Sequence, residues 1–316
     1  MTEGTKSAGT LAAVRICSLV PAATEVLFGL GLGADVVGVT HECDYPPEAS
    51  TRSVVTAALV ETDELTSAQI DDAVAEGASN GRPLYAIDEK RWAEIDADVV
   101  VAQELCDVCA VTTSDVGDIL EARDVAVDVI PYSPSTLNGI LASVVALGVR
   151  LGAEGAADEM TAAMRARLAR VEGALAQVET SPRVFVTEWL EPPYSAGHWV
   201  PDMVAAAGGT DVAGMSGERS HRMRWADVAA LRPEVVVLAP CGFDLDRTLA
   251  EVSPLDLSAH LLGTPAREES RVFAVDAGGL FSRPGPRVVD GVELLAYLLH
   301  PDLYGDPGGA WSRVRL

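Results

Sequence analysis

Residues 14–40 read VRICSLVPAATEVLFGLGLGADVVGVT, two β-branched runs on either side of a segment rich in alanine and leucine. The runs at 14–20 and 36–40 predict buried strands, and residues 22–30 between them predict a helix. Pro21 suits the first turn of that helix, where its missing N–H costs nothing. A strand, a helix and a second strand in this order predict a largely parallel sheet.

The same alternation continues along the chain. Further strands are predicted at residues 84–87, 99–102, 125–130, 184–187, 235–239 and 272–275. Helices are predicted at 66–78 and 289–299, and across 135–178 with a break near 152–155. The second part of this long stretch is rich in alanine, methionine, arginine and leucine, which suits a helix that connects two domains.

A short internal repeat indicates two equivalent lobes. Trp92 begins the sequence WAEI before one predicted strand, and Trp225 begins WADV before another. A chain of 316 residues is also long for a single core. The predicted fold class is therefore α/β, with Rossmann-like lobes of parallel sheet at 14–150 and 181–316 and a long spine helix within 151–180.

Composition excludes several classes of partner. A formal net charge of -24 leaves no basic face for nucleic acid or for an anionic membrane. The chain has no apolar run long enough for a membrane span, and residues 1–13 lack the features of a signal peptide. The sequence therefore predicts a cytoplasmic protein without membrane insertion, whose cysteines act as thiols or metal ligands.

Residues that bind soft metal ions follow two predicted strands, at the sheet edge where α/β proteins place ligands. His41 and Cys43 lie beyond one strand, and Cys106 and Cys109 form a C-x-x-C pair beyond another. His41 and Cys43 share one side of an extended loop because side chains alternate there. Together the four could hold zinc or another soft ion, whereas partly buried thiols are an equally good reading of the cysteine pair alone.

Three motifs carry a resemblance to a known family. Residues 18–25 (SLVPAATE) and 38–47 (GVTHECDYPP) resemble the start of cobalamin and iron-chelate substrate-binding proteins of ABC importers, and 192–209 (PPYSAGHWVPDMVAAAGG) is similar to their second-lobe signature. The resemblance covers residues 14 to 299. It implies two lobes around a spine helix, a small-molecule metal chelate as ligand, and an ABC permease as partner.

The aromatic residues of the chain are few and concentrate in the loops beyond the strands, where flat apolar walls suit a macrocycle. Each of them taken singly suits core packing, but their grouping favours binding. With polar neighbours they form the predicted ligand-binding set: Tyr45, Glu104, Tyr132, Glu188, Trp189, Tyr194, His198, Trp199 and Phe281. His198 could ligate cobalt or bond a carboxamide, or it could simply precede a helix.

Two functions from different classes stay open. The first, which we prefer, is a non-catalytic binding protein that closes two lobes over a cobalamin-like corrinoid. The second is a cytoplasmic metal-binding protein or metalloenzyme that holds an ion at the His/Cys site, with Glu42 or Glu188 as acid or base. The sequence shows no nucleophile triad, and Gly29, Gly31 and Gly33 fit the end of a helix better than a phosphate-binding loop.

Overall fold

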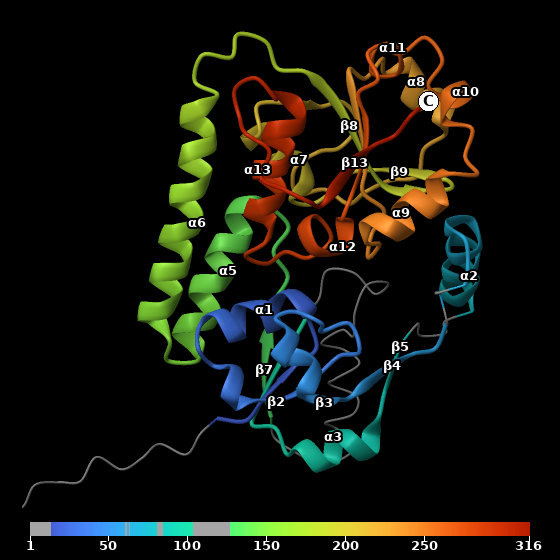
Figure 1. The fold of residues 1–316 in the computed structure, drawn as a ribbon. Helices are drawn as coiled ribbons and strands as arrows, with labels where there is room; N and C mark the ends of the chain where they lie inside the picture. Colours follow the sequence, from blue (N-terminus) through green and yellow to red (C-terminus); the bar gives the residue numbers. More distant parts are fainter. Residues whose placement is uncertain (1–13, 61, 63, 81–84, 104–126) are drawn as a thin grey trace, which may run out of the picture.

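The computed structural model describes residues 14–60, 62, 64–80, 85–103 and 127–316, which form two lobes, one below the other in Figure 1. The N-terminal lobe contains a parallel sheet in the order β3-β2-β1-β6-β7. Its strands are β1 (Ile16–Ser18), β2 (Val36–Val39), β3 (Ser53–Val54), β6 (Val99–Ala102) and β7 (Asp128–Pro131). The predicted α/β class with parallel sheets in two lobes is confirmed.

Both faces of this first sheet are covered by helices. Ile16 and Val101 pack on the side of α1 (Pro21–Gly29), and Cys17 and Val100 pack on the side of α3 (Glu89–Ile95). Burial on both faces explains why the strands read as continuous apolar runs. Two 3-10 turns, η1 (Gly33–Asp35) and η2 (Pro47–Thr51), complete the connections around β2.

The C-terminal lobe follows the same plan. Its sheet has the parallel order β10-β8-β11-β12, with β13 added antiparallel to β12 and β9 antiparallel to β8. The strands are β8 (Arg183–Leu190), β9 (Pro193–Ser195), β10 (Thr210–Asp211), β11 (Val235–Leu238), β12 (Val272–Val275) and β13 (Trp311–Arg313). The helices are α7 (Val200–Ala206), α8 (Trp225–Ala230), α9 (Leu245–Val252), α10 (Leu257–His260), α11 (Pro265–Glu268), α12 (Ala277–Leu280) and α13 (Val288–Leu299).

The internal repeat of the sequence corresponds to a structural repeat. Helix α3 with Trp92 leads into β6, which lies beside β1, and helix α8 with Trp225 leads into β11, which lies beside β8. Both tryptophans are buried. Each lobe therefore uses the same short helix to feed a central strand.

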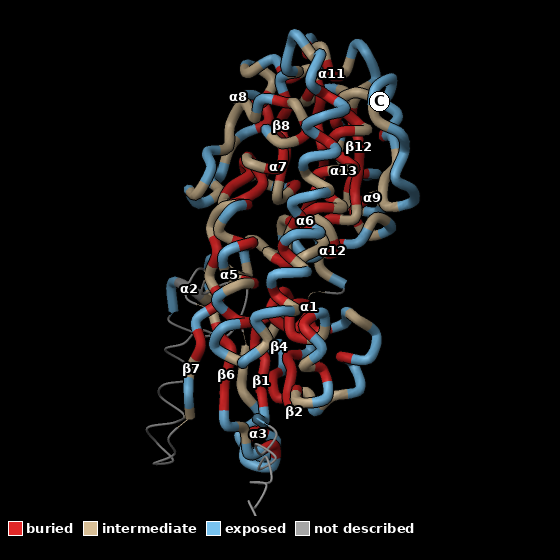
Figure 2. The backbone as a smooth tube through the Cα atoms, turned by 90° about the vertical axis from the view of Figure 1, so that its left-hand side faces the viewer, coloured by how far each residue is buried: buried red, intermediate tan, exposed pale blue. Residues whose placement is uncertain are grey.

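The lobes are connected by two long helices that pack side by side, α5 (Leu137–Arg150) and α6 (Glu154–Ala174). Helix α6 has 21 residues and so extends for about 30 Å, alongside both lobes in Figure 2. Arg167 of α6 pairs with Asp290 and Glu293 of α13, which fixes the spine to the C-terminal lobe. Among the helices of the described residues, none has the length and apolarity to span a membrane.

A separate arm projects from the N-terminal lobe. It consists of the antiparallel pair β4 (Thr56–Ala58) and β5 (Tyr85–Ile87), with α2 (Ser67–Ser79) between them in the chain. In Figure 1, α2 lies beside the C-terminal lobe, on the side of the molecule away from α5 and α6. The strand predicted at 84–87 is present as β5, but it pairs in this arm and not in the main sheet.

Candidate functional site

Residues beyond the carboxyl ends of strands in the two sheets contact each other. The hydroxyl of Tyr132, just beyond β7, donates to the carbonyl of Pro284 beyond β12, at 2.8 Å. Farther from the spine, Nε1 of Trp189 in β8 donates to the carbonyl of Ser67 in α2, at 2.9 Å. The carboxyl edges therefore lie at the interface between the lobes, which is where open α/β sheets bind ligands.

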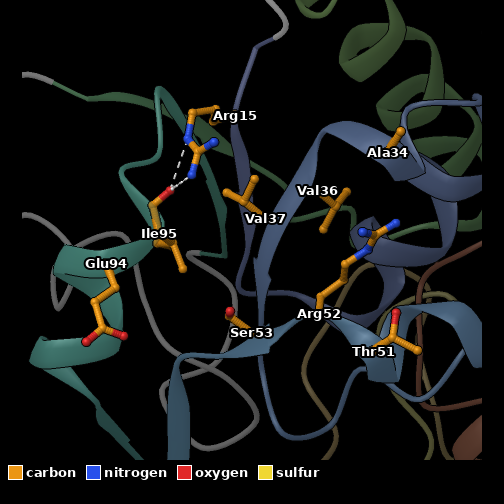
Figure 3. Close-up of a pocket in the computed structure, with 9 residues that line it drawn as sticks. All are labelled: Arg15, Ala34, Val36, Val37, Thr51, Arg52, Ser53, Glu94 and Ile95. Atoms are coloured by element: carbon orange, nitrogen blue, oxygen red, sulfur yellow. Dashed lines mark hydrogen bonds between the residues drawn. The ribbon is translucent and has the colours of Figure 1, made fainter.

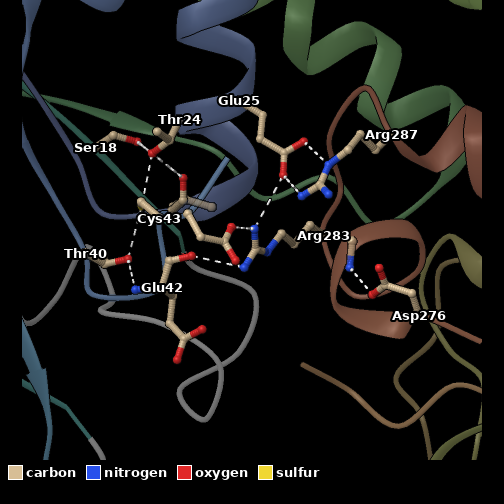
Figure 4. Close-up of polar contacts among 12 residues, drawn as sticks. Ser18, Thr24, Glu25, Thr40, Glu42, Cys43, Asp276, Arg283 and Arg287 are labelled. Atoms are coloured by element: carbon tan, nitrogen blue, oxygen red, sulfur yellow. Dashed lines mark hydrogen bonds and ion pairs between the residues drawn. The ribbon is translucent and has the colours of Figure 1, made fainter. Parts of the chain in front are cut away.

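Four charged side chains form a bridge between the lobes, which we call the interlobe ion cluster: Glu25, Asp44, Arg283 and Arg287. Figure 4 labels Glu25 and the two arginines. Arg287 donates to both carboxylate oxygens of Glu25, at 2.6 and 3.0 Å. Arg283 pairs with Asp44, and its Nη1 lies 3.7 Å from Oε1 of Glu25. The cluster thus connects α1 and the loop beyond β2 to the loop beyond β12.

Burial of the charged groups in this cluster has a desolvation cost. Glu25 is 4% exposed, and a charge at that depth is tolerated only when it is paired. Burial raises the pKa of Glu25, and the hydrogen bond and charge of Arg287 counteract part of the rise. Burial would also raise the pKa of Asp44, but its hydrogen bond and ion pair with Arg283 hold that pKa below its usual value.

The amino-acid sequence alone does not predict the ion cluster. A glutamate inside the apolar run of residues 22–30 is the available signal, because a carboxylate in a helix with a buried face needs a partner. The partner itself lies more than 250 residues away in the chain, since Arg287 follows Glu25 by 262 positions. No local pattern connects two residues at that separation.

Two of the predicted ligand residues of the N-terminal lobe lie beside this cluster. Tyr45 is 45% exposed, and the guanidinium of Arg287 lies 4.1 Å from the centre of its ring. Tyr132 is 2% exposed, and burial raises the pKa of its hydroxyl. Tyr45 is therefore accessible, whereas Tyr132 mainly joins the lobes. Glu104 lies outside the described residues.

Two further predicted residues, Trp189 and Tyr194, are partly buried and face the arm. The ring of Trp189 lies 5.3 Å from that of Phe243, centre to centre, and the hydroxyl of Tyr194 donates to Asp71 of α2 at 2.9 Å. Burial and the neighbouring Asp71 raise the pKa of Tyr194. These aromatic groups lie at the interface between the lobes, where the N-terminal lobe already contacts them.

Glu188 and His198 are found in the β8–β9 region. The carboxylate of Glu188 accepts a hydrogen bond from the backbone N–H of Gly197, at 2.8 Å. His198 has a φ of 51°, and its ring stacks on Trp199 with 5.8 Å between ring centres. Its Nδ1 is buried without a hydrogen-bond partner, and burial, with the charge of Arg219, lowers its pKa.

Trp199 and Phe281 belong to the core of the C-terminal lobe. They are 7% and 2% exposed, and Nε1 of Trp199 donates to the carbonyl of Phe281 at 2.8 Å. This burial favours a packing role for both side chains. The sequence predicts them as ligand contacts because they are aromatic, but residue type alone does not distinguish a core residue from one that lines a binding site.

The predicted metal ligands are only partly described by the structure. Nδ1 of His41 lies 2.8 Å from the Thr56 hydroxyl. The Cys43 sulfur is buried, within 3.1 to 3.2 Å of the hydroxyl oxygens of Thr24 and Thr40. Burial raises the pKa of the Cys43 thiol, although those hydrogen bonds lower it somewhat. Cys106 and Cys109 lie outside the described residues, and within the described ones no group of three or more His, Cys, Asp or Glu could hold an ion.

A cavity of about 330 Å³ lies elsewhere, at the amino ends of strands in the first sheet (Figure 3). Residues preceding or beginning β1, β2 and β3 line it, including Arg15, Val36 and Ser53. The guanidinium of Arg15 donates to the carbonyls of Ile95 and Asp96. Because ligands bind at carboxyl ends of parallel strands, this cavity is a poor candidate for the main site.

Comparison with known proteins agrees with this geometry. A family model described as periplasmic binding protein matches residues 16–277. An uncharacterized ABC transporter substrate-binding lipoprotein of Bacillus subtilis, YvrC, is 25% identical over 303 residues, which is 92% of this chain and 81% of that protein. The expectation of a cytoplasmic protein is therefore wrong, because the family is periplasmic and this relative is a lipoprotein.

Solved structures share the fold. A periplasmic heme binding protein of Pseudomonas aeruginosa superposes with a TM-score of 0.71 at 19% identity, covering 96% of this chain and 99% of that one. The vitamin B12 binding protein BtuF of Vibrio cholerae gives a TM-score of 0.65 at 20% identity, covering 90% and 96% of the two chains. Identity at this level supports the two-lobed fold and leaves the ligand to be argued from the residues.

Proposed function

Because the chain belongs to the periplasmic binding protein family, we propose that it is a substrate-binding protein that holds a metal chelate between its lobes and delivers it to an ABC permease. The observation that carries this proposal is the meeting of the carboxyl-edge loops of the two parallel sheets. Aromatic side chains, Tyr45 from one lobe and Trp189, Tyr194 and Phe243 from the other, lie on these facing edges. Flat rings at such an edge suit a planar macrocycle.

The finer proposal is a cobalamin-like corrinoid. Heme carries anionic propionates, which binding sites usually pair with arginine, whereas the rim of a corrinoid carries neutral amides. Beside the ring of Tyr45, Arg283 and Arg287 both pair with acids. These arginines already have partners, and the net charge of -24 repels a dianion, so a neutral rim is favoured.

Titration of the pure protein with cyanocobalamin, cobinamide and hemin tests this. We expect calorimetric binding and a visible spectral shift with the two corrinoids, and weaker binding of hemin. Trp189→Ala should weaken corrinoid binding about tenfold or more, the loss typical of a central aromatic contact. Leu262→Ala, at a side chain that is 68% exposed on the same lobe, is the control and should not change affinity.

The titration tests the corrinoid proposal and the broader metal-chelate proposal separately. Tighter binding of hemin than of either corrinoid would contradict the finer proposal and keep the broader one. No binding of any of the three at high micromolar concentration would overturn both.

The alternative of a resident soft metal ion receives no specific support. Zinc binds deprotonated sulfur, and burial raises the pKa of the Cys43 thiol in the metal-free protein. The set His41, Cys43, Cys106 and Cys109 stays a prediction. Elemental analysis of protein purified without chelators decides it, and a near-stoichiometric metal ion that is lost in Cys43→Ser would establish the site.

A further inference from the structure

The α2 arm contacts the C-terminal lobe through a set of polar interactions. The backbone N–H of Ser67 donates to Oε2 of Glu251 at 2.9 Å, and its carbonyl accepts from Trp189. Before the helix, Nη2 of Arg247 donates to the carbonyls of Thr62 and Leu65, at 2.7 and 3.0 Å. Each of these bonds joins the N-terminal lobe to the C-terminal one.

Asp71 is the charged centre of this contact. Its two carboxylate oxygens have different partners on the C-terminal lobe: Tyr194 donates to Oδ1 at 2.9 Å, and Arg222 lies 3.2 Å from Oδ2. The Asp71 side chain is only 12% exposed, so the interaction is screened less than a surface ion pair. One residue of the arm thus binds two residues of the other lobe.

The α2 arm can separate from the C-terminal lobe because the contact between them is mainly polar. Among the α2 side chains whose burial is described, only Ser67 and Ile70 are buried. The β4–β5 pair that carries the helix belongs to neither large sheet. Polar bonds can exchange with water at small net cost, whereas an apolar interface cannot, so this arm can leave the C-terminal lobe without exposing a core.

The arm lies against the aromatic side chains at the carboxyl edge of the second sheet, so its departure would expose them. It engages Trp189 and Tyr194 at the carboxyl edge of the second sheet, and Arg247, which donates to the arm, also stacks on Phe243 with 4.3 Å to the ring centre. Three aromatic groups proposed above as ligand contacts are therefore held by or lie beside the arm. The spine helices lie on the opposite side of the molecule, so they leave this side free to open (Figure 1).

We propose that α2 is a detachable latch, fastened by Asp71, whose release uncovers the aromatic edge and admits the ligand. This inference rests on the proposed function for the identity of the ligand, but the latch itself is a property of the free protein. In this mechanism the binding-competent state is the released one, so the observed association rate is proportional to the fraction of molecules with α2 released.

Asp71→Ala is the test, and Asp72→Ala is the matched control, because Asp72 is an exposed neighbour in the same helix and its removal changes the charge equally. Hydrogen–deuterium exchange of the ligand-free protein should show faster uptake in residues 67–79 of Asp71→Ala than of wild type or the control. Stopped-flow mixing with cyanocobalamin, and in parallel with hemin, should show an association rate raised by about fivefold, the effect of losing one net hydrogen bond of ordinary strength. Arg222→Met removes the same ion pair from the other lobe without changing α2, and it should shift exchange and association rate in the same direction but by less, because Tyr194 still donates to Asp71.

Unchanged exchange in both Asp71→Ala and Arg222→Met would overturn the latch. Faster exchange with an unchanged association rate would overturn its role in ligand entry. If wild type binds neither probe, the proposed function fails, while the exchange experiment still decides whether α2 is latched.

Discussion

At the scale of single residues, the interlobe ion cluster predicts a sharp contrast between two arginines. Arg287→Met leaves Glu25, at 4% exposure, without its principal partner, and we expect it to lower the free energy of unfolding by about 3 kcal/mol, the usual cost of a broken buried pair. Arg224→Met removes an ion pair with Asp227 between side chains that are 80% and 46% exposed, and should leave the free energy of unfolding almost unchanged. Urea unfolding followed by circular dichroism measures both, and equal midpoints would contradict the assignment.

His198 predicts a component of the pH dependence of stability. Its pKa is lowered by burial and by Arg219, so the folded state favours the neutral ring, whereas the unfolded chain protonates near pH 6.5. Stability from this group is fully present above that pH and is lost as the pH falls from about 6.5 through the folded pKa. His198→Asn, which tolerates the φ of 51°, should therefore lose less stability than wild type between pH 7 and pH 5. Urea midpoints at several pH values give the comparison, and parallel curves would contradict it.

At the scale of elements, the contact between α5 and α6 depends on the absence of a side chain at Gly148. A Cβ at this position would overlap the Cβ of Ala157, and neither atom can move without its backbone. Gly148→Ala should therefore destabilise the protein by about 1–3 kcal/mol, despite a gain of up to about 1 kcal/mol in helix propensity. Gly173→Ala in α6 has open space around it and is the control, expected to be neutral or slightly stabilising in thermal unfolding. A Gly148→Ala variant as stable as wild type would show that the helices can move apart freely.

The elements also show how far the sequence can predict this fold. The strands β1, β2, β6, β8, β11 and β12 were predicted because sheet burial on both faces produces continuous β-branched runs, and α1, α2, α5, α6 and α13 because their segments are long. The sequence does not predict the strands β3, β4, β9, β10 and β13, because they have two or three residues each and are incompletely buried. In the site, the aromatic side chains of Trp189 and Tyr194 are predicted as ligand contacts and lie at the interface. The same prediction covers Trp199 and Phe281, which lie in the core. Side-chain type does not encode which face a residue presents, and the charged pairs across the interface depend on contacts between distant parts of the chain.

At the scale of the whole molecule, the described residues join the lobes, besides the spine, through the ion cluster, the Tyr132–Pro284 hydrogen bond beside it, and the α2 arm. The ion cluster connects α1 to the loop beyond β12, and the arm connects Asp71 to Tyr194 and Arg222. Both contacts oppose separation of the lobes. If either is cut, the other still opposes separation, so the effects of the two changes on opening should exceed the sum of the single effects.

The double variant Asp71→Ala with Arg287→Met tests this coupling by small-angle X-ray scattering in the absence of ligand. We expect each single variant to keep a radius of gyration close to that of wild type, and the double variant to show a clear increase, because both contacts between the lobes are then weakened. Asp72→Ala with Arg287→Met is the matched control, since it has the same net charge and an intact latch, and it should scatter like Arg287→Met alone. An increase already complete in Asp71→Ala would mean that the ion cluster does not restrain the lobes. No increase in the folded double variant would mean that the spine and the remaining contacts set their distance, in which case ligand entry would have to proceed by movement of α2 without separation of the lobes.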